Sequence, residues 1–252
     1  MMNHDKEHAL PGRFLAARLE GRDFSRLTAA HGYPEPRFDP LLRDAMAGTV
    51  RTLMESGFRV IYGFAQGTEI SLLFHPDEDA PARQAQGCAS VLAATASAAL
   101  SLRLGQQAVF DCRMLALPSA GRVRDYFLRR QEAAQQDARR ALCALALRRE
   151  RADEVERLLR DLPAAETNAL LLRHGLNFDV LPWWQTRGVG VWWADVEKLA
   201  FDPADGTAFV TTRRALYTEY ELPQREAYAE LVLSYCASAD PDPADEALRC
   251  GA

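Results

Sequence analysis

The sequence is poor in lysine and carries no excess of positive charge. Its 252 residues include 30 lysines and arginines against 35 aspartates and glutamates, for a formal net charge of -5. Lys6 and Lys198 are its only lysines, so nearly all of the positive charge belongs to arginine. This balance argues against a protein that attracts nucleic acid through a strongly basic overall field, and leaves room only for a local patch of arginines.

Cysteine is also scarce and irregularly spaced. The five cysteines are an odd number, and no two of them lie at C-x-x-C spacing. This pattern argues against a zinc site and against a disulfide framework. A reducing, cytoplasmic setting is therefore the expected one.

Long hydrophobic runs are missing as well. The longest apolar run, Cys88–Leu102, is rich in alanine and serine and predicts a buried helix too short to span a bilayer, so no membrane partner is expected. Residues 1–12 are polar, without the apolar stretch of a signal peptide, and are expected to form an N-terminal tail. Residues 239–252 are acidic, contain proline and predict a disordered tail.

Hydrophobic spacing in the first half predicts a ferredoxin-like order of elements. The expected elements are a strand (14–19) closed by a turn at Glu20–Arg22, a helix (41–56), a hairpin of two strands (58–64 and 69–74), a second helix (81–102) and a strand (108–117). This order, strand, helix, hairpin, helix, strand, is that of the split βαβ fold. We therefore expect an α+β protein whose palm-like domain, residues 13–120, has an antiparallel sheet with helices on one face.

The second half predicts an extension packed on this palm, over residues 121–238. It begins with an arginine-rich helical stretch from Gly121 to His174, interrupted near Pro163. Short strands are expected at 189–193, 198–201 and 208–216, the last two joined as a hairpin, followed by a helix at 225–238. The extension is thus expected to be helical with a β-hairpin.

Two glutamates occupy the most informative turns of the predicted palm. In a ferredoxin-like sheet, the end of the first strand and the tip of the central hairpin lie side by side, which brings Glu20 close to Glu69. Acidic groups in such a place hold two divalent metals that stabilise the attacking and leaving oxygens of phosphoryl transfer. The alternative is that each is an ordinary solvated glutamate at a turn.

Several longer motifs in register resemble those of the tRNA-histidine guanylyltransferase family, in its bacterial guanylyltransferase-like branch. They are Arg18–Phe24 (R-hydrophobic-D-G-R-x-F), Tyr62–Ser71 (Y-G-x-T-Q-S-D-E-x-S), Phe110–Arg113 with Pro118 (F-D-x-R…P), Asp125–Glu132 (D-Y-F-x-W-R-Q), Asn177–Gly188 (N-x-x-x-L-P…R-G) and Thr212–Arg214 (T-R-R). Their order and spacing agree from about Arg13 to Tyr235, which is a far more specific signal than any single motif.

The resemblance implies a polymerase-like palm that uses two Mg²⁺ ions to add nucleotides to the 5′ end of RNA in the 3′–5′ direction. It implies ATP or GTP as ligand or substrate, tRNA or another RNA 5′ end as partner, and a tetramer. The site residues that it implies are Glu20 and Glu69 for catalysis; Glu20, Gly21 and Glu69 for metal; Gly21, Arg22, Asp23, Phe24, Arg83 and Asn168 for nucleotide; and Arg130, Arg187, Arg213 and Arg214 for RNA.

The departures from the family pattern fall on functional positions. The second metal-binding aspartate is matched by Thr68, which is neutral and cannot supply the charge of a bridging carboxylate. The R-Q-x-D-x-H-x-N helix falls on Arg130–Asp137 and loses its Asp, His and Asn, while the K-N-E element falls on Thr167–Ala169 and keeps only Asn168. We expect metal binding at the palm to be weak or absent.

Three functions remain open from the sequence. The first is a divergent guanylyltransferase-like protein with lost or reduced catalysis, which binds nucleotide or the tRNA end or assembles with an active relative. The second is a working Mg²⁺-dependent 3′–5′ nucleotidyltransferase, with metal held by Glu20, Glu69 and the carbonyl of Gly21. The third is a purely structural subunit.

Apolar residues of the extension favour assembly with a second subunit. A small palm cannot cover all of its leucines, so some are expected to face another copy or an active relative; they are Leu142, Leu145, Leu158, Leu159, Leu170, Leu171 and Leu172. The alternative is an intramolecular second core. The pairs Trp183–Trp184 and Trp192–Trp193 could stack on bases, although core packing or a subunit contact is the more common role of such residues.

Overall fold

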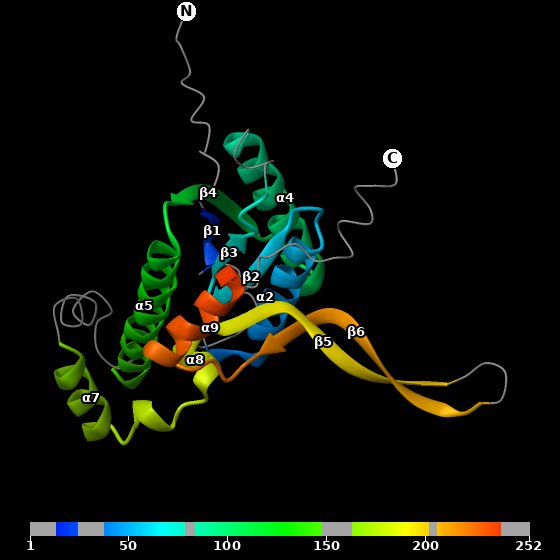
Figure 1. Ribbon diagram of the computed structural model, residues 1–252. Coiled ribbons are helices and arrows are strands. Elements are labelled where there is room, and N and C mark those ends of the chain that lie inside the picture. The colour runs from blue at the N-terminus through cyan, green and yellow to red at the C-terminus, as the bar shows by residue number, and fades with distance from the viewer. Residues whose placement is uncertain (1–13, 25–37, 79–83, 148–162, 202–205, 238–252) are drawn as a thin grey trace, which may run out of the picture.

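A computed structural model of the chain describes residues 14–24, 38–78, 84–147, 163–201 and 206–237 (Figure 1). The two predicted tails, 1–12 and 239–252, lie outside these residues, and so do Arg83, Leu158 and Leu159.

The predicted palm is confirmed in its order of elements. The chain runs through β1 (Phe14–Arg22), α2 (Pro40–Met54), β2 (Val60–Gln66), β3 (Glu69–Phe74), α4 (Ala85–Leu104) and β4 (Val109–Leu117). These strands lie in the order β4-β1-β3-β2, and the three neighbouring pairs are antiparallel. The first strand is therefore central, and its end lies beside the tip of the β2–β3 hairpin.

The predicted turn at Glu20–Arg22 is wrong. Strand β1 continues through these residues, because Glu20, Gly21 and Arg22 pair with Asp111, Phe110 and Val109 of β4. A glycine and two charged residues signal a turn locally, but long-range pairing to a nine-residue partner strand keeps the backbone extended. The side chains of these residues consequently alternate between the two faces of the sheet.

The extension adds two strands to the same sheet. It contains α5 (Ala120–Ala146), α7 (Ala164–Arg173), a 3₁₀ turn (Phe178–Val180), α8 (Trp183–Arg187), β5 (Val189–Phe201), β6 (Ala208–Glu219) and α9 (Glu226–Ala237). Strand β5 pairs with β2, so one six-stranded sheet, β4-β1-β3-β2-β5-β6, crosses the predicted domain boundary at residue 120.

Helices cover both faces of the sheet. Helices α2 and α4 pack on one face over a core that includes Leu19, Leu72 and Leu92, as the palm prediction required. Helices α5 and α9 cover the opposite face, where Phe127 and Tyr228 contact strand residues of β2 and β3. The extension thus closes the face that the palm helices leave open (Figure 1).

Helix α4 is the helix, among the described residues, that is long and apolar enough by composition to cross a membrane. It packs on the sheet through one face that includes Leu92, Ala96 and Leu100, and the Ser97 hydroxyl accepts a hydrogen bond from the backbone of Phe110. The prediction of a buried helix was wrong in part, because only 28% of the most apolar stretch of α4 is buried. Alanines and serines limit the apolar surface that this helix exposes, although Val91 and Leu102 are 49% and 85% exposed.

Strands β5 and β6 form a ribbon that extends beyond the rest of the sheet, where two shorter hairpin strands were predicted (Figure 1). We call its distal part, residues 196–201 and 208–213, the arm. Leu199 and Val210 are paired across the arm and are 58% and 63% exposed, and Phe201 beside them is 63% exposed.

The leucines of the extension mostly form an intramolecular core. Leu142 and Leu171 are buried with Phe178 between α5 and α7, and Leu145 and Leu170 pack against them. The expectation that these leucines face another subunit was therefore wrong for this group. Leu172 is the exception, at 62% exposed.

Candidate functional site

Alternation along β1 places three charged residues on the face that α5 covers. Leu15, Ala17 and Leu19 point into the core under α2 and α4. Residues at the intervening positions, Arg18 and Glu20 among them, therefore point to the other face, because successive side chains of a strand alternate. Arg22 follows the same alternation, so the end of β1 presents two arginines and a glutamate toward α5.

The register of the sheet places two more carboxylates beside Glu20. Glu20 is paired with Glu69 of β3 on one side and with Asp111 of β4 on the other. Directly paired residues in antiparallel strands share a face, with Cβ atoms about 5 Å apart. Three acidic residues thus form a row across three neighbouring strands. The predicted proximity of Glu20 to Glu69 is confirmed by their direct pairing.

Arginines occupy the space around these carboxylates. Arg18 Nη2 lies 2.8 Å from Glu20 Oε1 and 2.7 Å from Glu69 Oε2, and it bridges the two glutamates. Arg130, on α5, places Nη1 2.9 Å from Glu69 Oε1. Both oxygens of Glu69 therefore already accept a charged hydrogen bond. The hydrogen bond to Glu69 is also the main reason that the pKa of Arg18 is raised above its usual value.

A third ion pair completes the group, between Arg22 Nη2 and Asp111 Oδ2. We call these residues the charge cluster: Arg18, Glu20, Arg22, Glu69, Asp111 and Arg130. Its three guanidinium groups balance its three carboxylates, so the cluster has no formal net charge. Arg22 is the most exposed partner in these pairs, at 60% of its side chain.

Helix α5 is fixed over the cluster by polar contacts to the palm. The hydroxyls of Ser71 and Tyr126 lie 2.9 Å apart, and Gln66 Nε2 donates to the carbonyl of Ala134 at 3.2 Å. Burial raises the pKa of Tyr126, which keeps its phenol neutral. These contacts determine where Arg130 meets Glu69.

Gly21 and Phe24 shape the end of the site by packing. The amide of Gly21 donates to the carbonyl of Thr68 at 2.9 Å, which joins the end of β1 to the hairpin tip. The ring of Phe24 lies where a Cβ at position 21 would be, so only glycine fits there. Phe24 is buried and meets Phe110 edge-on at 5.6 Å. Asp23, between them, has a left-handed backbone with φ of 52°.

The residues present do not offer a ready two-metal site. In the described part of the chain no group of three or more His, Cys, Asp or Glu side chains could hold a metal ion. Thr68 contributes no charge at the hairpin tip, and Glu69 would have to release an arginine before it could bind a cation. One feature points the other way: among the described residues, buried Asp111 Oδ1 has no hydrogen-bond partner.

The remaining predicted site residues are scattered. Asn168 lies on α7, which packs against α5 near Cys143, and thirteen residues of helix separate Cys143 from Arg130, about 20 Å. Arg187 donates to the carbonyl of Leu222 at 3.2 Å, and burial lowers its pKa. The last two predicted residues, Arg213 and Arg214, are exposed on β6, at the base of the arm.

Sequence reasoning missed Arg18 and Asp111 as members of the site. Both stand inside motifs that were recognised, at Arg18–Phe24 and Phe110–Arg113. Their roles follow from the pairing of β1 with β4, which fixes the shared face and which no single motif contains.

The tryptophan pairs divide between core and surface. Trp192 and Trp193 pack against the cores on opposite faces of the sheet, so the core role is confirmed for this pair. Trp183 is 43% exposed, with the guanidinium of Arg187 3.8 Å from its ring centre. Trp184 is stacked by Arg43, 4.8 Å from its ring centre.

Solved structures share this fold. A bacterial tRNA(His) guanylyltransferase (Thg1)-like protein in complex with ATP is 22% identical, with a TM-score of 0.71 over 92% of this chain and 93% of that one. A bacterial Thg1-like protein in complex with GTP is 23% identical, with a TM-score of 0.65 over 92% and 93% of the two chains. The tRNA(His) guanylyltransferase of Saccharomyces cerevisiae is 17% identical, with a TM-score of 0.65 over 73% and 86%.

Sequence comparison points to the same family. No curated protein sequence matched the chain. Residues 2–118 match the family model described as Thg1, tRNAHis guanylyltransferase. This segment contains β1, the hairpin and β4, which carry five of the six members of the charge cluster. Residues 2–118 of this chain are therefore similar to the tRNAHis guanylyltransferase family, and the chain as a whole shares the fold of the solved Thg1-like and tRNA(His) guanylyltransferase structures.

Proposed function

We propose that this protein binds a nucleoside triphosphate and a tRNA or other RNA 5′ end in the cytoplasm, with catalysis lost or strongly reduced. Support for the nucleotide comes from the two bacterial Thg1-like relatives, whose structures hold ATP and GTP. Support for the RNA comes from the family itself, which is named for its action on histidine tRNA.

The main support for a loss of catalysis is that two arginines form ion pairs with Glu69. Its oxygens lie 2.7 Å from Arg18 and 2.9 Å from Arg130, while Arg18 also holds Glu20. A divalent ion would have to displace these guanidinium groups and would find neutral Thr68 instead of a second carboxylate. Hard cations such as Mg²⁺ are usually held through one or two carboxylates together with substrate phosphates.

The arginines of the cluster suit phosphate binding. Arg22 is exposed at the end of β1, and its guanidinium contacts Asp111 through one nitrogen, leaving its other donors for a ligand. Arginine binds phosphate oxygens through a planar fork of donors. A triphosphate placed at Arg22 would lie beside Gly21 and the hairpin tip, without requiring a metal-bridged carboxylate pair.

Calorimetry of GTP binding, with Mg²⁺ and with EDTA, tests this proposal together with a nucleotide-addition assay on histidine tRNA. We expect affinities within about threefold of each other, because Mg²⁺ adds few protein contacts, and no metal-dependent addition. A tight two-ion site, or addition that requires Mg²⁺, would contradict the loss of catalysis. Absence of both GTP and tRNA binding would instead favour a purely structural subunit.

A working Mg²⁺-dependent nucleotidyltransferase is the second candidate, and Asp111 favours it. Asp111 Oδ1 is buried with no partner among the described residues, and Asp111 is paired directly with Glu20. Two such carboxylates could hold one cation if Arg22 moved away on nucleotide binding. Metal-dependent addition that is lost in Asp111→Asn and retained in Asp125→Asn, a control on the outer part of α5, would establish this alternative.

We also propose that the chain self-associates or assembles with an active relative. The support is the exposed apolar surface of the arm, where Leu199, Phe201 and Val210 are all more than half exposed. A contiguous patch of exposed apolar residues usually marks a surface that another molecule covers. Assembly with a catalytic relative would give a regulatory role to a chain with little or no catalysis of its own.

A further inference from the structure

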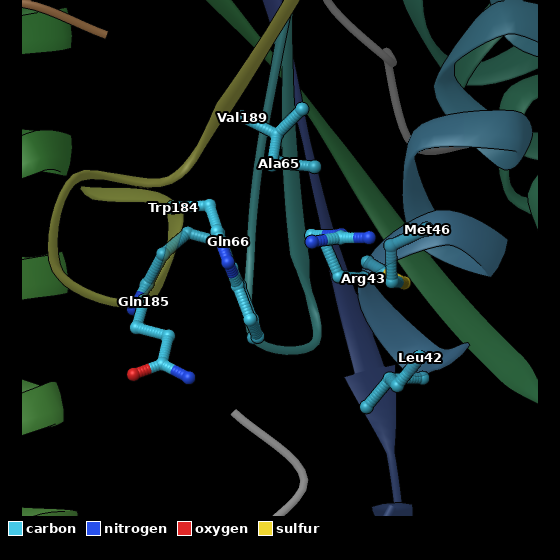
Figure 2. Close-up of a pocket in the computed structure, with 9 residues that line it drawn as sticks. Leu42, Arg43, Met46, Ala65, Gln66, Trp184, Gln185 and Val189 are labelled. Carbon is cyan, nitrogen blue, oxygen red and sulfur yellow. The ribbon is translucent and has the colours of Figure 1, made fainter. Parts of the chain in front are cut away.

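A recess lies at the tip of the β2–β3 hairpin, beside the start of α2. It has an empty volume of about 360 Å³, including its open mouth, and is walled by the start of α2, the hairpin tip and α8 (Figure 2). Its floor is apolar, formed by side chains of α2, β2 and β5, among them Met46. Its polar walls are Arg43, Gln66 and Gln185, and Trp184 supplies an aromatic surface. An apolar floor with a few polar groups is typical of small-molecule sites.

Aromatic rings hold the wall of the recess in place. The guanidinium of Arg43 lies 4.8 Å from the ring centre of Trp184 and 4.6 Å from that of Tyr220. The Tyr220 hydroxyl donates to Asp44 at 3.2 Å. The planar groups that would contact a flat ligand are therefore fixed by α2, α8 and the segment after β6 before any ligand binds.

The electrostatics of the recess argue against an anion as its main occupant. Arg43 makes a two-point contact with Asp44, with Nε 2.8 Å from Oδ1 and Nη2 3.0 Å from Oδ2. The Arg43 guanidinium keeps the pKa of Asp44 below its usual value, so Asp44 is ionised and the pair is neutral. Arg43 would attract phosphate only weakly, because Asp44 already neutralises its charge. A neutral ligand with hydrogen-bond donors and acceptors on its edge does not need an unpaired charge for binding.

Hydrogen-bonding capacity remains on the walls. The Nε2 of Gln66 donates a hydrogen bond to the Ala134 carbonyl, which leaves Oε1 of the same amide as an acceptor. Arg43 retains Nη1 as a donor beyond its contact with Asp44. The Gln185 amide, on the segment across the hairpin from Arg43, offers both kinds of group (Figure 2). Donors and acceptors around an aromatic surface match the edge and face of a nucleobase.

We propose that this recess binds one unstacked nucleobase, stacked on Trp184 and read by the Arg43, Gln66 and Gln185 side chains. The assignment rests on the proposed function, because nucleotide and RNA binding make a nucleobase the natural occupant. The base comes from a mononucleotide or from an RNA end, and both sources share the chemistry that the recess recognises. The hairpin tip joins the recess to the charge cluster through the bond from Gly21 to Thr68, so base and phosphate would be held at the tip of the same hairpin.

Substitution of Trp184 tests the inference, with its neighbour as a matched control. The probes are GTP, inorganic tripolyphosphate, and a hexamer of uridylate, each titrated by calorimetry into the full chain. Loss of stacking on one base should weaken GTP or the hexamer at least about fivefold in Trp184→Leu. Tripolyphosphate, which has no base, should bind unchanged. Trp183→Leu, the same change one residue earlier at a side chain outside the recess, should leave all three within about twofold.

The two ligands distinguish the source of the base. Weakening of GTP alone assigns the recess to a mononucleotide, and weakening of the hexamer alone assigns it to RNA; either result supports the inference. Unchanged binding of both ligands to Trp184→Leu overturns it while leaving the proposed function intact. Failure of the wild-type chain to bind either ligand overturns the proposed function as well. If circular dichroism shows that Trp184→Leu is unfolded, Gln185→Ala takes its place under the same criteria.

Discussion

At the residue scale, Glu69 has two charged partners, more than either of the other carboxylates of the charge cluster. Arg18 contacts it from a strand and Arg130 from a helix, although the two arginines are 112 residues apart in the chain. Its side chain is 29% exposed, so these contacts are only partly screened by water. Removing its charge would leave two guanidinium groups without their carboxylate.

Glu69→Gln is therefore expected to lower the free energy of unfolding by about 1–3 kcal/mol, because hydrogen bonds to charged groups are the stronger ones and their loss leaves partners unmatched. Glu20→Gln, which gives up one contact at a 34% exposed side chain, should cost less than about 1 kcal/mol. Urea unfolding followed by circular dichroism measures both. Equal losses in the two variants would show that Glu69 is not the centre of the cluster.

Restoring the lost aspartate is not expected to restore catalysis. Thr68→Asp combined with Glu20→Asp supplies two carboxylates, yet Arg18 and Arg130 still hold Glu69. Gln135 stands at the position of the family's His and Thr167 at that of its Lys, so both lack the groups that neutralise phosphate charge. Removing one preorganised donor typically costs about 10²–10³ in rate. Guanosine addition at the rate of an active relative, measured on histidine tRNA, would show that these losses do not matter.

The thiol of Cys112 should be unreactive in the folded protein. Burial raises its pKa to about 12, with Asp111 contributing in the same direction. A raised pKa keeps the thiol protonated below that pH, and only the thiolate is nucleophilic. At pH 8 we expect Cys112 to react with a thiol reagent at least about tenfold more slowly in buffer than in urea, as measured by peptide mass spectrometry. Equal rates would mean that this strand edge is open to solvent.

At the element scale, the sequence predicts the palm better than the extension. Local signals locate α2 and the β2–β3 hairpin, because Leu42, Val50 and Leu53 have helical spacing and the strand bounds Glu69–Phe74 follow from alternation and turn residues. The end of β1 and the full length of β5 could not be found in this way, since both depend on pairing with strands far along the chain.

The candidate site shows the same division. Proximity of Glu20 to Glu69 follows from the order of elements and could be predicted. The arginines around them could not, because Arg130 reaches Glu69 only through the position of α5 across the sheet. That position depends on Tyr126 and Gln66, whose partners are distant in sequence.

The arm is the element whose surface is least explained by the chain itself. Leu199→Ser combined with Val210→Ser should change the free energy of unfolding by less than about 1 kcal/mol, because cross-strand pairs at exposed positions contribute little. The same variant should lower the average mass in light scattering toward that of the 28.1 kDa monomer. Thr211→Ser, at the position after Val210 on β6, is the control that keeps the apolar pair.

A wild-type chain that is already monomeric, with no change on adding an active relative, would rule out both modes of assembly. Self-association that survives the arm variant would place the contact elsewhere, and Leu172 on α7 and Leu102 on α4, which are 62% and 85% exposed, are candidates for it.

At the scale of the whole molecule, the palm and the extension are joined by more than the sheet. Gln131 is buried on α5 and donates through Nε2 to the carbonyl of Pro223 at 2.9 Å, with that of Arg187 at 3.5 Å. Tyr62 of β2 and Tyr228 of α9 place their hydroxyls 3.1 Å apart inside the second core. Polar and aromatic contacts of this kind require both parts of the chain to be in place.

The pairing of β2 with β5 also determines how the protein can be divided. A fragment that ends at residue 120 would keep every strand of the palm, yet β2 would become an open edge, and Tyr62, Phe64 and Leu73 would lose α5 and α9 as their cover. Unpaired strand edges beside apolar side chains template aggregation. The part that resembles an autonomous enzyme domain is thus expected to be the part that cannot be expressed alone, and limited proteolysis should yield no stable N-terminal half.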